Sequence, residues 1–184
     1  QFDATVDGQP LLTMREGTAG FFSQAELDAG KGIVQSGIEQ QEQAGLRPDD
    51  WRELVPMRKH ALDEGRLEAL RAGDLVGAFG EEFSGLGVER PLTIPGGRMR
   101  LVHRVTELDP DGGRYGVGGI VAEAHIQPDD WFLTCHFSDD QVMPGTLMYE
   151  CCLHTLRIFL LRMGWVAEEE GATWQPVPEV RSRL

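Results

Sequence analysis

The chain has 184 residues, enough for one domain or for parts of two, and its 41% hydrophobic and 26% charged residues are typical of a globular protein. Its formal net charge of −13 excludes a general affinity for nucleic acid, because phosphate binding needs a dense basic surface. No segment reaches the roughly 18 uninterrupted apolar residues of a membrane span. An acidic protein partner would need a local basic patch, and the arginines do cluster, at Arg98, Arg100 and Arg104, at Arg157 and Arg162, and at Arg181 and Arg183.

The first residues and the cysteines indicate the compartment. The chain opens without a basic segment followed by an apolar core, so it shows no secretory signal, and it does not begin with Met. The three cysteines, Cys135 and the adjacent pair Cys151 and Cys152, do not form the framework of a disulfide-rich secreted protein. We therefore expect reduced thiols and a cytoplasmic location.

Residues 4–22 predict two short strands around the turn at Asp7 and Gly8, because Asp-Gly supplies the positive φ angles of a tight hairpin. A lone hairpin is marginally stable in water, so we expect these strands to join a sheet completed outside this chain or much later in it. From Ser23 to Gly87 the pattern changes to short helical segments with Ser23 and Asp63 as N-caps. No catalytic residues stand out there, and this region is predicted to be a helical linker.

From Leu92 the strand pattern returns. Residues 99–108, the turn at 109–113 and residues 114–126 predict an antiparallel hairpin. Pro144 and Gly145 then open a long apolar helix from about Thr146 to Met163, which Gly164 ends. A further strand is predicted to start at Val180.

The long helix carries an ordered polar stripe. Nearly every position is apolar, which predicts a helix that protein surrounds on all sides. Glu150, His154 and Arg157 nevertheless share one face at i, i+4 and i+7, and Thr146 extends that face by one turn. Two interpretations stay open: an exposed i,i+4 ion pair of little energy, or a buried carboxyl group whose raised pKa suits a general acid.

His136 lies 14 residues before Glu150, in a turn that leads to the helix. Loop histidines are commonly structural, but here the amide of Gly145 at the helix N-terminus would supply an oxyanion donor beside a base and an acid. That set suits proton removal next to a thioester carbonyl. A metal site of Cys135, His136, Asp139 and Asp140 is the weaker alternative, because these residues are too close together for a standard zinc spacing. No metal or other cofactor is expected.

The segment "HFSDDQVMPGTLMYE", residues 136–150, resembles the active-site segment of the β-hydroxyacyl-acyl-carrier-protein dehydratases. It is closest to the β-hydroxydecanoyl dehydratase type, and within that to the dehydratase domains of polyunsaturated fatty acid synthases. The resemblance implies that His136 is the catalytic base and Glu150 its acidic partner. It also implies that Gly145, Thr146 and His154 bind the substrate or its oxyanion.

The resemblance further implies an α+β hot dog fold, in which a curved antiparallel sheet wraps a long central helix. Residues 1–22 would be the closing hairpin of a preceding hot dog, residues 23–87 the linker region, and residues 88–184 the N-terminal part of a second hot dog. In this family two hot dogs pair, as tandem halves or as a homodimer, so that the histidine of one faces the acid of the other. His136 and Glu150 therefore need not serve the same active site.

The implied activity is dehydration of a 3-hydroxyacyl thioester, carried by the phosphopantetheine arm of an acyl carrier protein, to the 2-enoyl thioester. Isomerisation to a 3-enoyl product stays open. The alternatives are a non-catalytic hot dog that binds acyl chains or scaffolds a synthase, and a hot dog thioesterase. Three positions depart from the family pattern: Gln141 stands where Pro is usual, His103 replaces an Asp, and His154 replaces a Gln.

Overall fold

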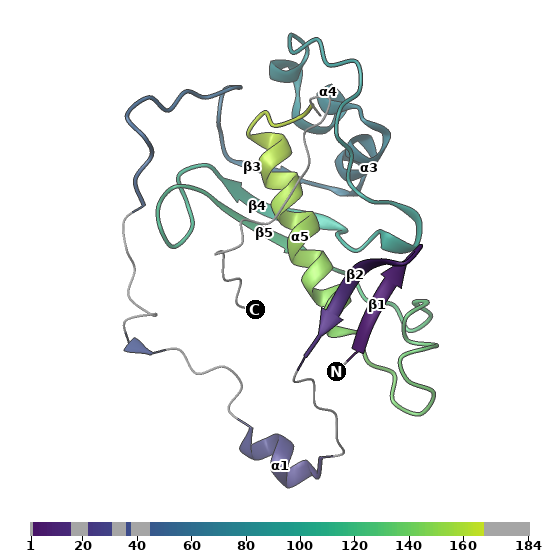
Figure 1. Cartoon of the computed structure of the whole chain (residues 1–184). Helices are drawn as coiled ribbons and strands as arrows, with labels where there is room; N and C mark the ends of the chain where they lie inside the picture. Colours follow the sequence, from purple (N-terminus) through teal and green to yellow (C-terminus); the bar gives the residue numbers. More distant parts are fainter. Residues whose placement is uncertain (1, 16–21, 31–35, 38–44, 168–184) are drawn as a thin grey trace. The chain divides into compact units, whose positions relative to one another are not determined.

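The computed structural model describes residues 2–15, 22–30, 36, 37 and 45–167 (Figure 1). They belong to two compact units, residues 1–41 and residues 42–184. No helix within the described ranges is long and apolar enough to cross a membrane. The strand predicted from Val180 lies outside the described residues.

The first unit contains the predicted hairpin. Strand β1 (Phe2–Val6) pairs antiparallel with β2 (Gln9–Met14), and Asp7 and Gly8 between them have φ angles of 49° and 78°. Two consecutive left-handed residues are what a tight two-residue hairpin requires, so this prediction is confirmed. The side chains of β2 are all exposed. Helix α1 (Gln24–Ala29) begins after the predicted N-cap Ser23, whose side chain and that of Glu26 form a capping box.

The second unit is built on a three-stranded antiparallel sheet in the order β3-β4-β5. Its strands are β3 (His60–Leu62), β4 (Arg104–Asp109) and β5 (Gly119–Glu123), and β4 and β5 form the hairpin predicted over residues 99–126. The first strand of that hairpin is shorter than predicted. Residues Gly97–Met99 form the short 3₁₀ helix η2, and the strand begins only at Arg104.

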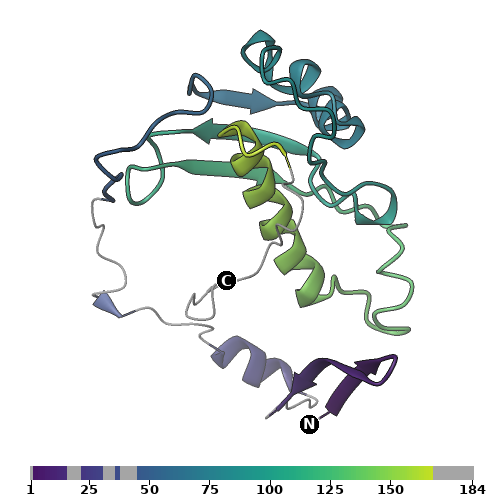
Figure 2. The ribbon, with the colours of Figure 1, turned by 45° about the horizontal axis from the view of Figure 1, so that its top comes forward.

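Helix α5 (Gly145–Arg162) matches the prediction of 146–163 within one residue and lies across the sheet (Figure 2). Its end is a Schellman motif. Gly164 has a φ of 95°, its amide donates to the carbonyl of Leu161, and the amide of Trp165 donates to the carbonyl of Leu160. Mixed helix and antiparallel sheet, with a long helix against the sheet, is consistent with a hot dog fold.

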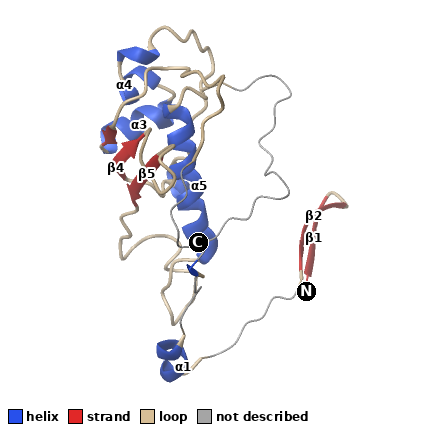
Figure 3. Cartoon of the chain, turned by 90° about the vertical axis from the view of Figure 1, so that its left-hand side faces the viewer, coloured by secondary structure: helices blue, strands red, loops and turns tan. Residues whose placement is uncertain are grey.

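The segment before residue 88 contributes to the same core. Helix α3 (Glu64–Ala72) begins after the predicted N-cap Asp63, and α4 (Leu75–Phe79) and the 3₁₀ helix η1 (Glu81–Phe83) follow it (Figure 3). Their apolar side chains join those of the sheet and of α5 in one cluster, which includes Leu62, Leu67, Leu70, Phe79, Phe83, Val105, Leu108, Ile158 and Leu161. The predicted boundaries at residues 22 and 87 stay a prediction, and the structure places β3, α3 and α4 in the compact unit that holds α5.

The expectation that protein surrounds α5 on all sides is wrong for the described residues. The helix buries Leu147, Ile158 and Leu161, whereas Met148, Leu153 and Leu156 are exposed. The reason is the width of the sheet, because three strands cover only one face of a helix that is apolar all round. An apolar sequence pattern cannot say whether its own chain or another one covers the second face.

Candidate active site

His136 lies in the segment between β5 and α5, where the backbone holds its ring in place. The amide of His136 donates to the carbonyl of Phe132 at 3.0 Å, and its own carbonyl accepts from the amide of Val142 at 3.1 Å. The ring atom Nδ1 lies 3.1 Å from the carbonyl oxygen of Val142. A carbonyl can only accept, so Nδ1 carries the proton and, in the neutral ring, Nε2 keeps its lone pair. The half-buried imidazole is thus arranged to take up a proton at Nε2.

A small second core anchors this segment beneath the start of α5. Leu101, Phe132 and Leu147 are buried together there, with Met143 and Cys151 packed against them. The indole Nε1 of Trp131 also donates to the carbonyl of Arg98 at 2.9 Å. Packing from three parts of the chain therefore sets the path of the loop that carries His136.

The N-terminus of α5 is open. Pro144 is the N-cap and makes no side-chain capping bond, while its carbonyl accepts from the amides of Leu147 and Met148. Gly145 and Thr146 are exposed, and outside the local turn no atom lies within 4 Å of the position that a Cβ on Gly145 would take. The first amides of a helix lack intrahelical partners and carry its positive dipole end, so this point can accept a negatively charged oxygen.

Glu150 and His154 form the i,i+4 pair of the polar stripe, with 3.4 Å between Oε2 and Nε2. Of the two members of this pair His154 is the buried one, because 40% of the Glu150 side chain is exposed, whereas only 8% of that of His154 is. Burial lowers the pKa of His154, the cations Arg157 and Arg71 lower it further, and Glu150 opposes them. A neutral His154 can donate from Nε2 to an oxygen of the Glu150 carboxyl group, which orients that group.

The structure does not bring His136 and Glu150 together in a contact. Among the described residues, the ion pair of Glu150 is with His154 and none joins it to His136. Cys135, Cys151 and Cys152 are free thiols, and burial raises the pKa of Cys151. In the described part of the chain no three His, Cys, Asp or Glu side chains converge as metal ligands, and this includes the alternative set around His136. The catalytic roles of the named residues stay predictions.

A largely apolar groove of about 480 Å³ follows α5 along its border with β5. Cys151, Cys152, Thr155 and Leu156 form one side of it, and the opposite side is lined by Val102, Ile120, Val121, Ala122, Glu123 and Ala124. Such a groove suits a flexible hydrocarbon chain, because apolar walls favour the transfer of methylene groups out of water. The residues that line this groove could not be predicted from the sequence, because they depend on how α5 packs against β5.

His103 contacts a second histidine, His125, and the sequence did not indicate this pair. Its ring stacks on that of His125 at 5.3 Å between centroids, and its Nδ1 accepts from the amide of His125 at 3.1 Å. Both histidines line a cavity of about 180 Å³ together with Met143 and Phe132. Burial lowers the pKa of His103, and the proximity of His125 and Arg100 adds to this. The pair forms because Arg104 opposes Glu123 across the hairpin, a register that one sequence does not reveal.

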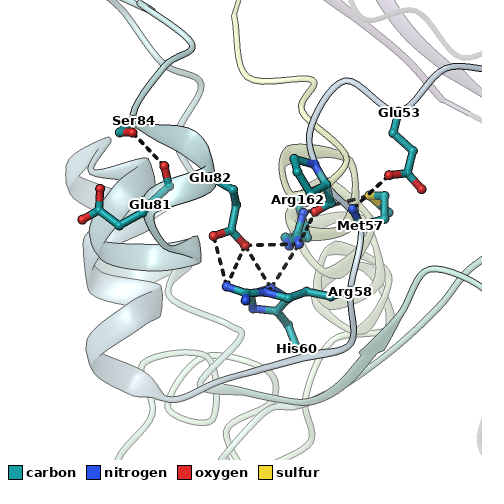
Figure 4. A network of polar contacts seen from close by, with 9 residues as sticks. Glu53, Met57, Arg58, His60, Glu81, Glu82, Ser84 and Arg162 are labelled. Carbon is teal, nitrogen blue, oxygen red and sulfur yellow. Dashed lines mark hydrogen bonds and ion pairs between the residues drawn. The ribbon is translucent and has the colours of Figure 1, made fainter.

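Sequence reasoning also missed a buried ionic network at the far end of α5 (Figure 4). Arg162 is fully buried, and its Nη2 donates to the carbonyl of Pro56 at 2.8 Å and contacts His60 Nε2 at 3.1 Å. Its Nη2 also lies 3.6 Å from Glu82 Oε1, and Arg58 binds the same carboxylate at 2.8 Å. The sequence marked Arg162 only as one member of an arginine cluster, because its partners lie about a hundred residues earlier.

The elements around His136 and α5 match a known family. Residues 94–182 match the family of the FabA-like domain, and this range holds β4, β5, α5, His136 and Glu150. Residues 94–182 belong to the FabA-like family. The resemblance found in "HFSDDQVMPGTLMYE" is thereby confirmed.

A similarity to one curated protein covers more of the chain than the FabA-like match does. The chain is 32% identical over 167 residues, or 89% of its length, to a polyunsaturated fatty acid synthase subunit of a Thraustochytrium species. The chain spans only 11% of the length of that protein. The aligned part is longer than the FabA-like segment, so it also takes in residues outside the family match.

Proposed function

We propose that the FabA-like segment dehydrates 3-hydroxyacyl thioesters to 2-enoyl thioesters in fatty acid synthesis, with the acyl group carried on the phosphopantetheine arm of an acyl carrier protein. The observation that carries this proposal is the ring of His136, whose Nδ1–H is bound to the carbonyl of Val142 and whose Nε2 is left as a base. The same loop leads directly to the open N-terminus of α5. The FabA-like match and the related synthase support the reaction class.

The reaction needs a base, an acid and a site for negative charge. Nε2 of His136 removes a proton from C2, and the amides of Gly145 and Thr146 stabilise the negative charge that develops on the thioester oxygen. The carboxyl group of Glu150 gives a proton to the departing C3 hydroxyl group. Water leaves, the C2–C3 double bond forms, and His136 returns its proton to restore Glu150. Isomerisation to a 3-enoyl thioester would use the same base at C4.

His154 has a positioning role in this proposal. Its Nε2 lies 3.4 Å from Oε2 of Glu150, and its burial fixes the direction from which it donates. The acyl chain would lie in the apolar groove between β5 and α5, whose wall runs past Cys151, one residue after Glu150. A substrate chain in this groove has its reactive end near the polar stripe of the helix.

We further propose that a second hot dog unit completes this site, as a tandem half or as a homodimer partner. Two observations support it: the exposed apolar face of α5 and the position of β5 at the edge of the sheet in the described residues. An unpaired strand edge beside an apolar surface is suited to pairing with another sheet. In such a pair Glu150 of one unit faces the histidine of the other, which accounts for the lack of a contact between Glu150 and His136. The β1–β2 hairpin would be the closing hairpin of the preceding unit.

The test is turnover of a 3-hydroxyacyl thioester by the full chain and its variants, with the product identified by mass spectrometry. We expect His136→Ala to reduce dehydration by about 10²–10⁴-fold or more while the fold persists, and Glu150→Gln to be impaired as well. His125→Ala is the matched control, because it removes an exposed imidazole from the neighbouring segment. Near-normal dehydration by His136→Ala would refute the assignment of the base.

The product separates the alternatives. Release of free acid would indicate a thioesterase, and acyl binding without turnover would indicate a non-catalytic hot dog. The position of the double bond in the product would decide whether isomerisation follows.

A further inference from the structure

A basic cavity of about 600 Å³ lies where β3, α3 and β4 meet, in a chain whose net charge is −13. Its lining holds four basic side chains, those of Arg58, Lys59, Arg66 and Arg104, and one acidic side chain, that of Asp63. Asp63 is already engaged, since its carboxylate caps α3. A concentration of positive charge on an acidic protein is a local feature that needs its own explanation.

We call the four basic side chains of this open cavity and their surroundings the basic surface. In its ion pairs the cationic side chain is exposed to solvent and the carboxylate is largely buried. The side chain of Arg58 is 61% exposed, whereas that of its partner Glu82 is 14% exposed. Lys59 is 76% exposed and its partner Asp109 only 11%. The carboxylates thus lie behind the cations, so a molecule approaching from solvent meets positive charge first.

The remaining two cations are still more available. Arg66 is exposed and has no ion pair among the described residues. Within the described part of the chain, the ion pair of Arg104 is a long contact of 3.8 Å to Glu123. The acids Glu107 and Asp111 act on Lys59 and reduce the field at that edge of the surface. Arg66 and Arg104 are therefore the best points for recognising a negative partner.

The surface extends along β4: Lys59 binds Asp109 at the end of this strand, and Arg104 lies at its beginning, on the side of the sheet that leads to the candidate base. Arg104 opens β4 and is paired in register with Glu123, the last residue of β5. From Glu123 the chain runs straight into the segment that carries His136. Three of the four cations precede residue 94 and lie outside the FabA-like segment, whereas Arg104 lies within it, so most of the surface comes from the part of the unit that the family match does not cover.

We propose that this surface, Arg58, Lys59, Arg66 and Arg104, docks an acidic protein face. If the proposed function is correct, that partner is the carrier domain that delivers the thioester. A protein face fits better than a small phosphate compound, because the cations are spread and solvent-exposed instead of converging in a buried cradle. Exposed charges of this kind mainly raise the rate of association and select the partner, which suits a carrier that must bind and leave in every cycle.

The experiment reverses the two least engaged charges in the full chain, Arg66→Glu with Arg104→Glu, and uses Arg90→Glu as the control for a single exposed arginine elsewhere. Each protein is assayed with a 3-hydroxyacyl group on the carrier domain and with the same acyl group on N-acetylcysteamine. We expect the reversed protein to show a KM for the carrier-borne substrate raised about tenfold, with weaker dependence on salt. Its rate on the N-acetylcysteamine thioester should match that of the wild type and of Arg90→Glu.

The two substrates separate this proposal from the proposed function. If the wild type dehydrates neither thioester, the proposed function fails, and docking is then read from direct binding of a fluorescent carrier domain. Unchanged carrier binding or KM in the charge-reversed protein would overturn the docking proposal, and so would binding of anionic vesicles in place of the carrier. Thermal melting checks the fold, and Arg66→Ala, an exposed truncation on α3, replaces the double variant if that variant unfolds.

Discussion

Replacing the buried guanidinium of Arg162 should destabilise the protein strongly. The residue lies in the last turn of α5, is fully buried, and connects the helix to the carbonyl of Pro56, to His60 and to Glu82. Its guanidinium also lies over the ring of Phe83, 5.5 Å from the centroid. Arg162→Met keeps much of the volume and removes the charge and the donors, so the effect isolates the polar contacts.

The size of the expected stability loss depends on which contacts of Glu82 remain after Arg162→Met. Removing one partner of a buried ion pair typically costs about 3–5 kcal/mol, because the other charge is left without compensation. Glu82 keeps the Arg58 contact at 2.8 Å, so the lower end applies, and we expect a loss of about 3 kcal/mol. For a unit of this size that loss corresponds to a fall in Tm of roughly 10 °C.

Urea denaturation followed by circular dichroism measures this loss, with Arg66→Met as the control for an exposed arginine. The double variant Arg162→Met with Glu82→Leu should recover part of the stability, because replacing both buried charges by apolar groups is often close to neutral. A loss below about 1 kcal/mol for Arg162→Met would show that the network contributes no more than an exposed pair does. A double variant whose loss equals the sum of the two single ones would likewise contradict a coupled buried pair.

Three further predictions concern other parts of the second unit. Burial and the cations Arg162 and Arg58 lower the pKa of His60 to about 4. As the pH falls below about 6.5, the unfolded chain therefore binds a proton before the folded chain does, and stability is lost down to about pH 4. His60→Gln should flatten this part of the stability–pH profile, and an unchanged slope would contradict the prediction. Gly118 has a φ of 142°, and a Cβ added there would overlap the ring of Phe159. Gly118→Ala should therefore lower the free energy of unfolding by about 2 kcal/mol. Gly85→Ala is the control and should change it little, because a Cβ at that position meets nothing within 4 Å. Asp63→Ala removes the N-cap of α3 and should cost about 1 kcal/mol in the same denaturation assay, with Asp63→Asn close to wild type; equal losses for both would argue against a capping role.

The candidate site was predictable where it rests on a motif and unpredictable where it rests on burial. The segment from His136 to Glu150 indicated the family, and the FabA-like match confirms this. The same residues could not reveal that Glu150 is partly exposed and that His154 is the buried member of the stripe. Helical spacing predicts which side chains share a face, but how deeply these side chains are buried depends on the sheet beneath them.

The local elements follow from the residue order alone. Asp7 and Gly8 set the hairpin turn, Ser23 and Asp63 start their helices, and Gly164 ends α5, because each acts through φ angles or hydrogen bonds within a few residues. Long-range packing was needed to show that residues 60–83 share a core with α5, that His103 stacks on His125, and that Arg162 is enclosed by partners as distant as His60. These features depend on which segments the chain brings together, and a single sequence does not encode that choice in any short pattern.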